Sequence, residues 1–261
     1  MFRVIESTPV MTGSYSPTMV GLSIIVAMMA SYIALDLAGR VTQSTGRAAK
    51  LWLVGGAFAM GAGIWSMHFI GMLAFSLPVP MMYDFGITIL SMLFAIIISG
   101  LALSLVSGRT LLVKQLVVGG IFMGIGICAM HYTGMAAMRM SPAIEYNPWL
   151  FAASVAIAIV AAMAALWLAF HLRKSDTARM MLGRVLAAIV MGFAIAGMHY
   201  TGMAASRFSP KSFCVGGANI NTGSLAVTTG TVAFVVLTVT TLFLTIDARR
   251  SPVLSAGSRS R

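Results

Sequence analysis

Seven long apolar segments, separated by short polar stretches, constrain the fold of this chain more than any other feature of its sequence. A helix needs about 20 mostly apolar residues to cross the hydrocarbon core of a bilayer, and each segment is long enough. Hydrophobic residues make up 59% of the chain and charged residues only 9%. A soluble domain needs more polar residues than this to cover its surface. We predict an all-α, polytopic membrane protein with seven transmembrane helices. The predicted spans are about 17–38, 51–76, 84–106, 115–138, 150–171, 185–205 and 225–247.

The distribution of Lys and Arg predicts the orientation of these helices, because basic residues collect on the cytoplasmic side. Of the 17 basic residues, 13 lie in the loops 39–50, 107–114 and 172–184 and in the tail after residue 247. The N-terminus is therefore expected outside and the C-terminus in the cytoplasm. The net charge of +11 comes mostly from these loops. A protein that binds single-stranded nucleic acid has aromatic residues between its basic residues, and this chain does not. We therefore expect it to lie in a lipid bilayer and to bind no nucleic acid.

The domain organisation is simple. Residues 1–16 form an outer segment, 17–247 the membrane domain, and 248–261 a Ser/Arg-rich cytoplasmic tail. We expect the tail to be unstructured from Ser251, with no catalytic or DNA-binding output module. The N-terminus does not read as a cleaved signal peptide, because the first apolar run continues to full spanning length. Two cysteines are too few for a disulfide framework.

One motif occurs three times. Residues 60–74 read MGAGIWSMHFIGMLA, residues 123–137 read MGIGICAMHYTGMAA, and residues 191–205 read MGFAIAGMHYTGMAA. Each copy lies in the second span of a pair, so the chain divides into three helix pairs plus a seventh helix. All three copies run from inside to outside, which places their histidines at similar depth in the outer part of the bilayer.

The motif His, two glycines and three methionines lie within an arc of about 140° on one side of the helix, given about 100° of rotation per residue. Small residues on one face let neighbouring helices approach closely. A packing seam left by gene triplication therefore accounts for the six motif glycines. These are Gly61, Gly71, Gly124, Gly134, Gly192 and Gly202.

Packing does not account for the histidines equally well, because ionisable residues inside a membrane are costly and indicate function. His68, His131 and His199 are three of the four histidines in the chain and occupy equivalent positions. Each is followed four residues later by a Met on the same helical face and preceded directly by another Met. His171 is different: it lies at the cytoplasmic end of its span and reads as an interfacial residue.

Imidazole and thioether groups form a soft ligand set that favours copper, particularly Cu(I). A site for a hard ion would need several carboxylates, and the chain has few. Cys128, one turn before His131, reads as a buried apolar residue, and no role follows for Cys214. The candidate metal ligands are His68, His131, His199, Met72, Met135, Met203, Met67, Met130 and Met198.

The motif resembles the signature of the bacterial MHYT domain. Residues 130–133 and 198–201 read Met-His-Tyr-Thr, and residues 67–70 are a variant, Met-His-Phe-Ile. The resemblance covers about 17–247, including the run Ser-Tyr-Ile-Ala-Leu-Asp at 31–36. It implies a sensor in the bacterial inner membrane, in which copper bound by the motif His and Met detects O2, CO, NO or redox state. Family members are often fused to domains that make or degrade cyclic di-GMP. We expect a standalone sensor here, which would need a separate cytoplasmic or membrane partner.

Other functions remain open from the sequence. A copper transporter or metal-insertion factor would use the deeper motif residues Met60, Met123 and Met191 as further ligands along a path. A membrane hydrolase could hold zinc through three His ligands and an open position for water, but a general acid or base is missing beside the histidines. Bis-His haem has no separate motif to support it. We therefore expect a non-enzymatic copper sensor.

Overall fold

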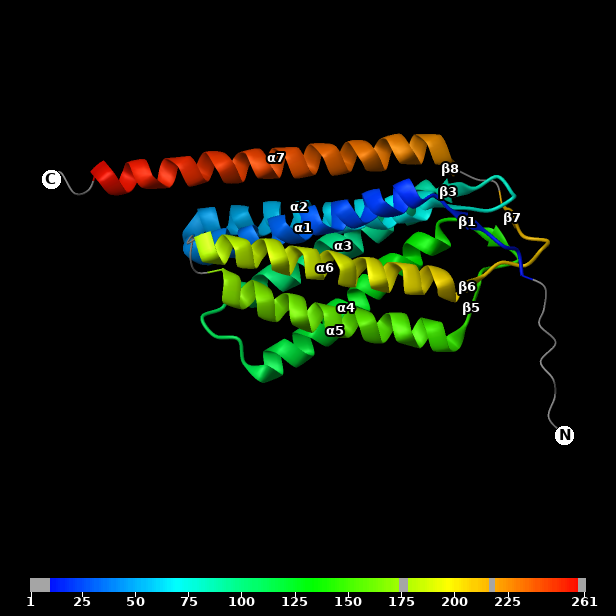
Figure 1. The fold of residues 1–261 in the computed structure, drawn as a ribbon, viewed down its shortest axis with the longest axis horizontal. Helices are drawn as coiled ribbons and strands as arrows, with labels where there is room; N and C mark the ends of the chain where they lie inside the picture. The colour runs from blue at the N-terminus through cyan, green and yellow to red at the C-terminus, as the bar shows by residue number, and fades with distance from the viewer. Residues whose placement is uncertain (1–9, 174–177, 216–218, 258–261) are drawn as a thin grey trace.

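The computed structural model describes residues 10–173, 178–215 and 219–257 (Figure 1). Seven helices in this part of the chain are long and apolar enough to cross a membrane, which confirms the predicted all-α, polytopic fold. The helices are α1 Pro17–Gln43, α2 Gly46–Ala74, α3 Phe85–Ser107, α4 Val113–Ala136, α5 Pro148–Leu172, α6 Ala178–Ala205 and α7 Thr222–Gly257.

Several helices extend beyond the predicted spans at the end that carries the basic loops. α1 continues to Gln43, α2 already begins at Gly46, and α7 runs on to Gly257. An α-helix satisfies its own backbone hydrogen bonds, so it can continue into water where the apolar pattern stops. We expected the tail to be unstructured from Ser251, but α7 continues as a helix to Gly257. Residues 258–261 lie outside the described residues.

The three helix pairs form a closed ring. Each helix from α1 to α6 packs against the next along the chain, and α6 packs against α1. α7 lies outside this ring, mainly along α2. The arrangement of three pairs plus a seventh helix is as predicted. Because α2 is covered by both its ring neighbours and α7, 72% of its span is buried, against 22% for α5 and for α7.

The first glycine of each motif copy joins one pair to the next. A Cβ atom at Gly61 would lie 2.6 Å from Ile96 Cα of α3, and one at Gly124 would lie 2.6 Å from Ile159 Cα of α5. Gly192 of α6 closes the ring in the same way, 2.9 Å from the backbone nitrogen of Met28 in α1. For these three glycines the packing interpretation is supported, since only a residue without a side chain fits.

Four short antiparallel ladders tie the loops together at the end opposite the basic loops. They pair β1 (Ser14–Tyr15) with β2 (Phe75–Ser76), β3 (Met82–Asp84) with β8 (Asn219–Asn221), β4 (Met140–Ser141) with β7 (Phe213–Cys214), and β5 (Glu145–Tyr146) with β6 (Ser206–Arg207). We call this region the outer cap.

Asp84 strengthens the cap at the start of α3. Its carboxylate accepts a hydrogen bond from the Ile87 backbone N–H at 3.0 Å and pairs with Arg139 at 3.3 Å. The Ile87 N–H and then the Arg139 guanidinium hold the pKa of this carboxyl below its usual value. The ionised Asp84 therefore caps a helix and joins two loops at once.

Candidate metal centre

The three motif histidines meet inside the ring. His68 lies on α2, His131 on α4 and His199 on α6, each five or six residues before its helix ends at the outer cap. At 1.5 Å per residue this places them about 8–9 Å below the cap. The even-numbered helices, which are separated along the ring by odd-numbered ones, contact one another across its middle. The equal depth expected from the repeat is thus present.

The imidazole rings point their Nδ1 atoms at one another. His68 Nδ1 lies 3.1 Å from His199 Nδ1 and 3.1 Å from His131 Nδ1. The three rings are nearly perpendicular to each other, with centroids 4.9–5.1 Å apart. None of the three side chains is more than 1% exposed. We call this group the His triad.

The Nε2 atoms point outward, each onto the second motif glycine of another copy. His199 lies on Gly71, His68 on Gly134 and His131 on Gly202, in each case so closely that a Cβ atom would overlap the ring. The contacts run in one direction around the axis, from α2 to α4, from α4 to α6 and from α6 to α2. These glycines therefore make room for imidazoles, a role beyond the helix packing that the sequence suggested.

The geometry of the His triad fits a metal ion. Two ligand bonds of about 2.0–2.1 Å at a tetrahedral angle hold their nitrogens about 3.3 Å apart, close to the two distances of 3.1 Å. An Nδ1–H group can donate to only one neighbour, whereas a cation satisfies three inward-facing lone pairs together. Among the described residues the triad is the one group of His, Cys, Asp or Glu side chains placed to hold an ion.

The motif methionines are all buried but do not share one environment. Met72, Met135 and Met203 belong to a single apolar cluster, which also contains Met130. Met67 and Met198 pack into two other clusters, the latter with Cys128 and Ala158. The residues at four positions after each His are thus gathered together, while those directly before it are dispersed.

Hydroxyl groups connect each motif helix to its outer neighbour, a feature that the sequence did not reveal. Tyr132 Oη lies 2.6 Å from Ser154 Oγ, and Tyr200 Oη lies 2.7 Å from Ser23 Oγ. In the variant copy, which has Phe69 instead of Tyr, the Trp65 indole N–H donates to the third serine, Ser91, at 3.1 Å. The sequence did contain a sign of these contacts, because Ser91 and Ser154 each follow their motif His by 23 residues.

The remaining His and Cys side chains lie apart from the triad. His171 is exposed at the basic end of α5, where its Nδ1 lies 2.8 Å from the Trp167 carbonyl oxygen. Cys128 is buried, and the Sγ of Cys214 in the outer cap contacts the Met138 carbonyl oxygen at 3.2 Å. The burial of Cys128 and the position of His171 at the basic end of α5 agree with the sequence, which assigned no role to Cys214.

Known proteins share the repeat. The family model "MHYT: Bacterial signalling protein N terminal repeat" matches residues 6–50, 61–119, 124–183 and 192–257. A bifunctional diguanylate cyclase/cyclic di-GMP phosphodiesterase, MucR of Pseudomonas aeruginosa, is 56% identical over 82% of this chain and 31% of its own length. The signaling protein YkoW of Bacillus subtilis is 41% identical over 75% of this chain and 24% of its own. The cyclic di-GMP phosphodiesterase NbdA of Pseudomonas aeruginosa is 44% identical over 74% of this chain and 24% of its own.

The chain thus spans about a quarter to a third of the length of these relatives, and no solved structure matches it. The family model covers most of the sequence, and three of its four matched stretches begin one residue after the start of a motif copy, within α2, α4 and α6. This chain belongs to the MHYT family of bacterial membrane signalling proteins, as a multi-pass protein of the inner membrane.

Proposed function

We propose that the chain is a membrane sensor that holds copper at the His triad and responds to a diatomic gas or to redox state. The observation that supports this proposal is the convergence of three buried imidazoles, whose ligand atoms lie within 4.8 Å of one another and in two pairs at 3.1 Å. Bound copper would supply an open coordination position at which O2, CO or NO could bind.

The residues of the chain then have separate roles. His68, His131 and His199 would hold the ion, and the cluster of Met72, Met135 and Met203 on the side of the outer cap would favour Cu(I) through its thioethers. Met67, Met130 and Met198 were also candidate ligands. Met67 and Met198 lie in separate apolar clusters, which favours packing roles for them, whereas Met130 shares the cluster of Met72, Met135 and Met203. Apolar walls keep water from the rings.

A signal requires that the ligand bind two helix arrangements with different affinity. Since each imidazole touches two other motif helices, a change at the triad would alter the packing of α2, α4 and α6 together. The relatives named as cyclic di-GMP enzymes suggest turnover of that nucleotide as the output, through a cytoplasmic or membrane partner.

A copper transporter is the second candidate, favoured by a small cavity of about 30 Å³ on the axis nearer the basic loops. Met60, Met123 and Met191 line it together with apolar side chains. The other described residues that line this cavity are Ala, Leu and Val, which offer no metal ligand. The cavity therefore contains no further ligand that would extend a transport path beyond the methionines. A zinc hydrolase is less favoured, because the triad contains no carboxylate to act as acid or base.

The test is elemental analysis of the purified chain after loading with Cu(I). We expect copper in the wild type and in the control His171→Ala, and loss of copper in a folded His68/His131/His199→Ala variant. CO binding, followed by infrared spectroscopy of the C–O stretch, then tests for the open position. Copper retained by the triple variant would contradict the metal site, whereas copper-dependent transport into vesicles would favour the second candidate.

A further inference from the structure

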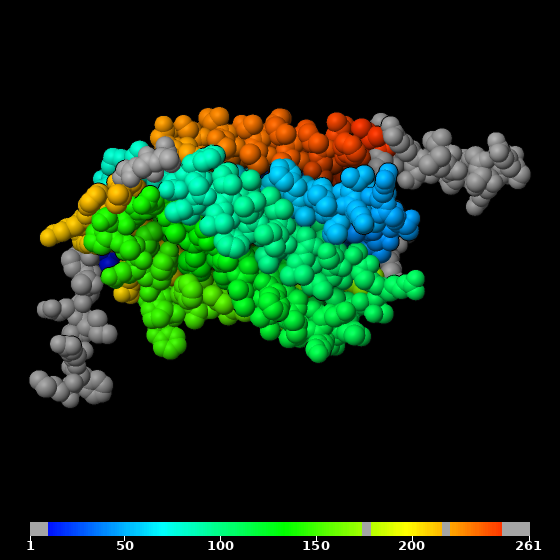
Figure 2. All heavy atoms as spheres, turned by 180° about the vertical axis from the view of Figure 1, so that it is seen from behind, coloured from blue at the N-terminus to red at the C-terminus, as the bar shows by residue number. Residues whose placement is uncertain are grey.

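An open apolar groove lies between α2 and α7, on the side of the molecule that carries the basic loops. Its volume is about 510 Å³, within the range of ligand-binding pockets. Leu51, Trp52, Gly55 and Ala59 of α2 form one wall, and Val239 and Phe243 of α7 form the other. In Figure 2 both helices lie at the surface, α7 in orange and this part of α2 in light blue.

The length of the groove matches one leaflet of a bilayer. Along α2 it extends from Ala48 to Ala59, which is about 16 Å at 1.5 Å per residue. Half of a hydrocarbon core of about 30 Å is about 15 Å. Because α2 begins at the basic loops, the groove occupies the cytoplasmic leaflet.

The lining of the groove suits a hydrocarbon chain. Apart from Trp52 and Thr240, the side chains that line it have no polar atom. An extended acyl chain has no polar group that needs a hydrogen-bond partner, so it can lie against such walls at no cost. The length and the lining together favour an acyl chain as the occupant.

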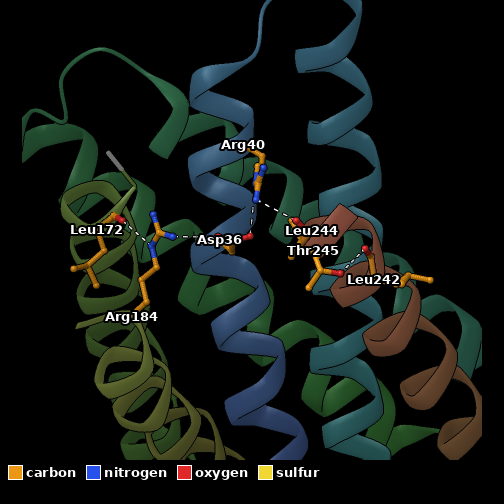
Figure 3. Close-up of polar contacts among 7 residues, drawn as sticks. All are labelled: Asp36, Arg40, Leu172, Arg184, Leu242, Leu244 and Thr245. Carbon is orange, nitrogen blue, oxygen red and sulfur yellow. Dashed lines mark hydrogen bonds and ion pairs between the residues drawn. The ribbon is translucent and has the colours of Figure 1, made fainter. Parts of the chain in front are cut away.

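On the α2 side, the cytoplasmic end of the groove carries two exposed cations. Arg47 is exposed one turn before Leu51 on the same face of α2, and Lys50 is exposed beside it. The first turn of α2 contains no acidic residue. The nearby carboxylate of Asp36 lies between Arg40 and Arg184, at 3.7 and 3.1 Å (Figure 3), so its charge is already offset.

We propose that this groove binds one acyl chain of an anionic phospholipid from the cytoplasmic leaflet, with the lipid phosphate between Arg47 and Lys50. The apolar walls receive the hydrocarbon, the groove ends where a leaflet's hydrocarbon ends, and the cations stand where the headgroup would lie. The site is independent of the His triad. Its occupant would contact α2 and α7 together and thereby influence where α7 leaves the membrane.

Quenching of Trp52 fluorescence by brominated lipids tests the proposal. The protein is placed in phosphatidylcholine vesicles that contain matched small fractions of brominated phosphatidylglycerol or brominated phosphatidylcholine. A Trp149→Phe/Trp167→Phe variant reports on Trp52, and a Trp52→Phe/Trp149→Phe variant reports on Trp167, which is exposed on α5. Trp65 stays in both as a common background, since it is buried.

We expect phosphatidylglycerol to associate with Trp52 more tightly than phosphatidylcholine, and Trp167 to show no preference. Removing one cation by Arg47→Gln or Lys50→Gln should weaken the preference about fivefold. Gly55→Leu should abolish it by filling the groove, since a Cβ atom there meets nothing within 4 Å. The matched control is Gly230→Leu, at a similarly open glycine of α7. Equal quenching by the two lipids, or quenching that survives Gly55→Leu, would overturn the proposal.

Discussion

The imidazole rings of the His triad depend on neighbours that have no side chain. Each ring is held between two other imidazoles on its Nδ1 side and a glycine backbone on its Nε2 side. Ring orientation decides which nitrogen is offered to a metal. The glycines are therefore part of the site even though they offer no ligand atom.

Gly134→Ala should displace the His68 ring, because the new Cβ atom overlaps its Nε2 edge. We expect Cu(I) affinity to fall on the order of tenfold or more, as when the groups that orient a ligand are lost, measured by competition with a chromogenic Cu(I) chelator. Gly197→Ala is the control, since its Cβ atom would meet nothing within 4 Å. Unchanged affinity in Gly134→Ala would show that the glycine does not position the ring.

At this scale the sequence predicted that the three histidines are equivalent, but not which residues they contact. Three equivalent histidines stood out because an imidazole is costly in a membrane, and the structure brings them together. The role of Gly71, Gly134 and Gly202 could not be predicted, since it depends on which helices become neighbours. A sequence repeat shows that positions are equivalent, but not which copy each one touches.

At the scale of helices, hydrogen bonds fix the inner helices against the outer ones at one level. Tyr132 of α4 reaches Ser154 of α5, and Tyr200 of α6 reaches Ser23 of α1. The third interface uses Trp65 and Ser91 in place of the missing tyrosine hydroxyl. The departure of copy one from the motif thus keeps the connection and changes only the donor, which explains how Phe69 is tolerated.

Tyr132→Phe and Tyr200→Phe should each destabilise the bundle by about 1 kcal/mol, because each removes one hydrogen bond between helices. Thermal unfolding in detergent would measure the loss. Tyr146→Phe serves as a control, since this residue lies in the outer cap and contacts Tyr132 and Phe151 through its ring. A loss as large in Tyr146→Phe as in the other two would contradict a specific role for the tyrosine–serine pairs.

Helix number and pairing were predictable from apolar length and from the repeat, whereas helix ends were not. The spans for α3 and α5 agree with the structure within about two residues. α6 begins at Ala178, before its predicted start, because a helix does not end where the bilayer does. The groove between α2 and α7 could not be predicted from the sequence, because a glycine such as Gly55 can equally well mark a close contact between helices.

At the scale of the whole molecule, α7 lies outside the ring of six helices and needs its own attachment. Figure 3 shows this attachment near the basic loops, where Arg40 of α1 donates to the Leu244 carbonyl oxygen of α7 at 3.3 Å. Asp36 holds Arg40 and also Arg184 of α6, which in turn donates to the Leu172 carbonyl oxygen of α5. A chain of charged groups therefore links α7 to helices from two pairs.

Asp36→Asn should loosen α7, because both arginines lose the carboxylate that positions them. Spin labels at Leu51→Cys of α2 and Leu242→Cys of α7, with Cys128→Ser and Cys214→Ser in the background, would report the separation of the helices by electron paramagnetic resonance. We expect a broader distance distribution in Asp36→Asn. Asp84→Asn breaks an ion pair at the opposite end and should leave the distribution unchanged; equal distributions in all proteins would contradict the link.

The directional contacts between histidines and glycines make the three motif copies depend on one another. Each imidazole lies against a glycine of another copy, and the ring of the third copy lies against the glycine of the first. In this arrangement, removal of any one copy would leave one ring without its glycine and one glycine without its ring. The contacts therefore form a closed cycle, in which a change in one copy reaches the other two.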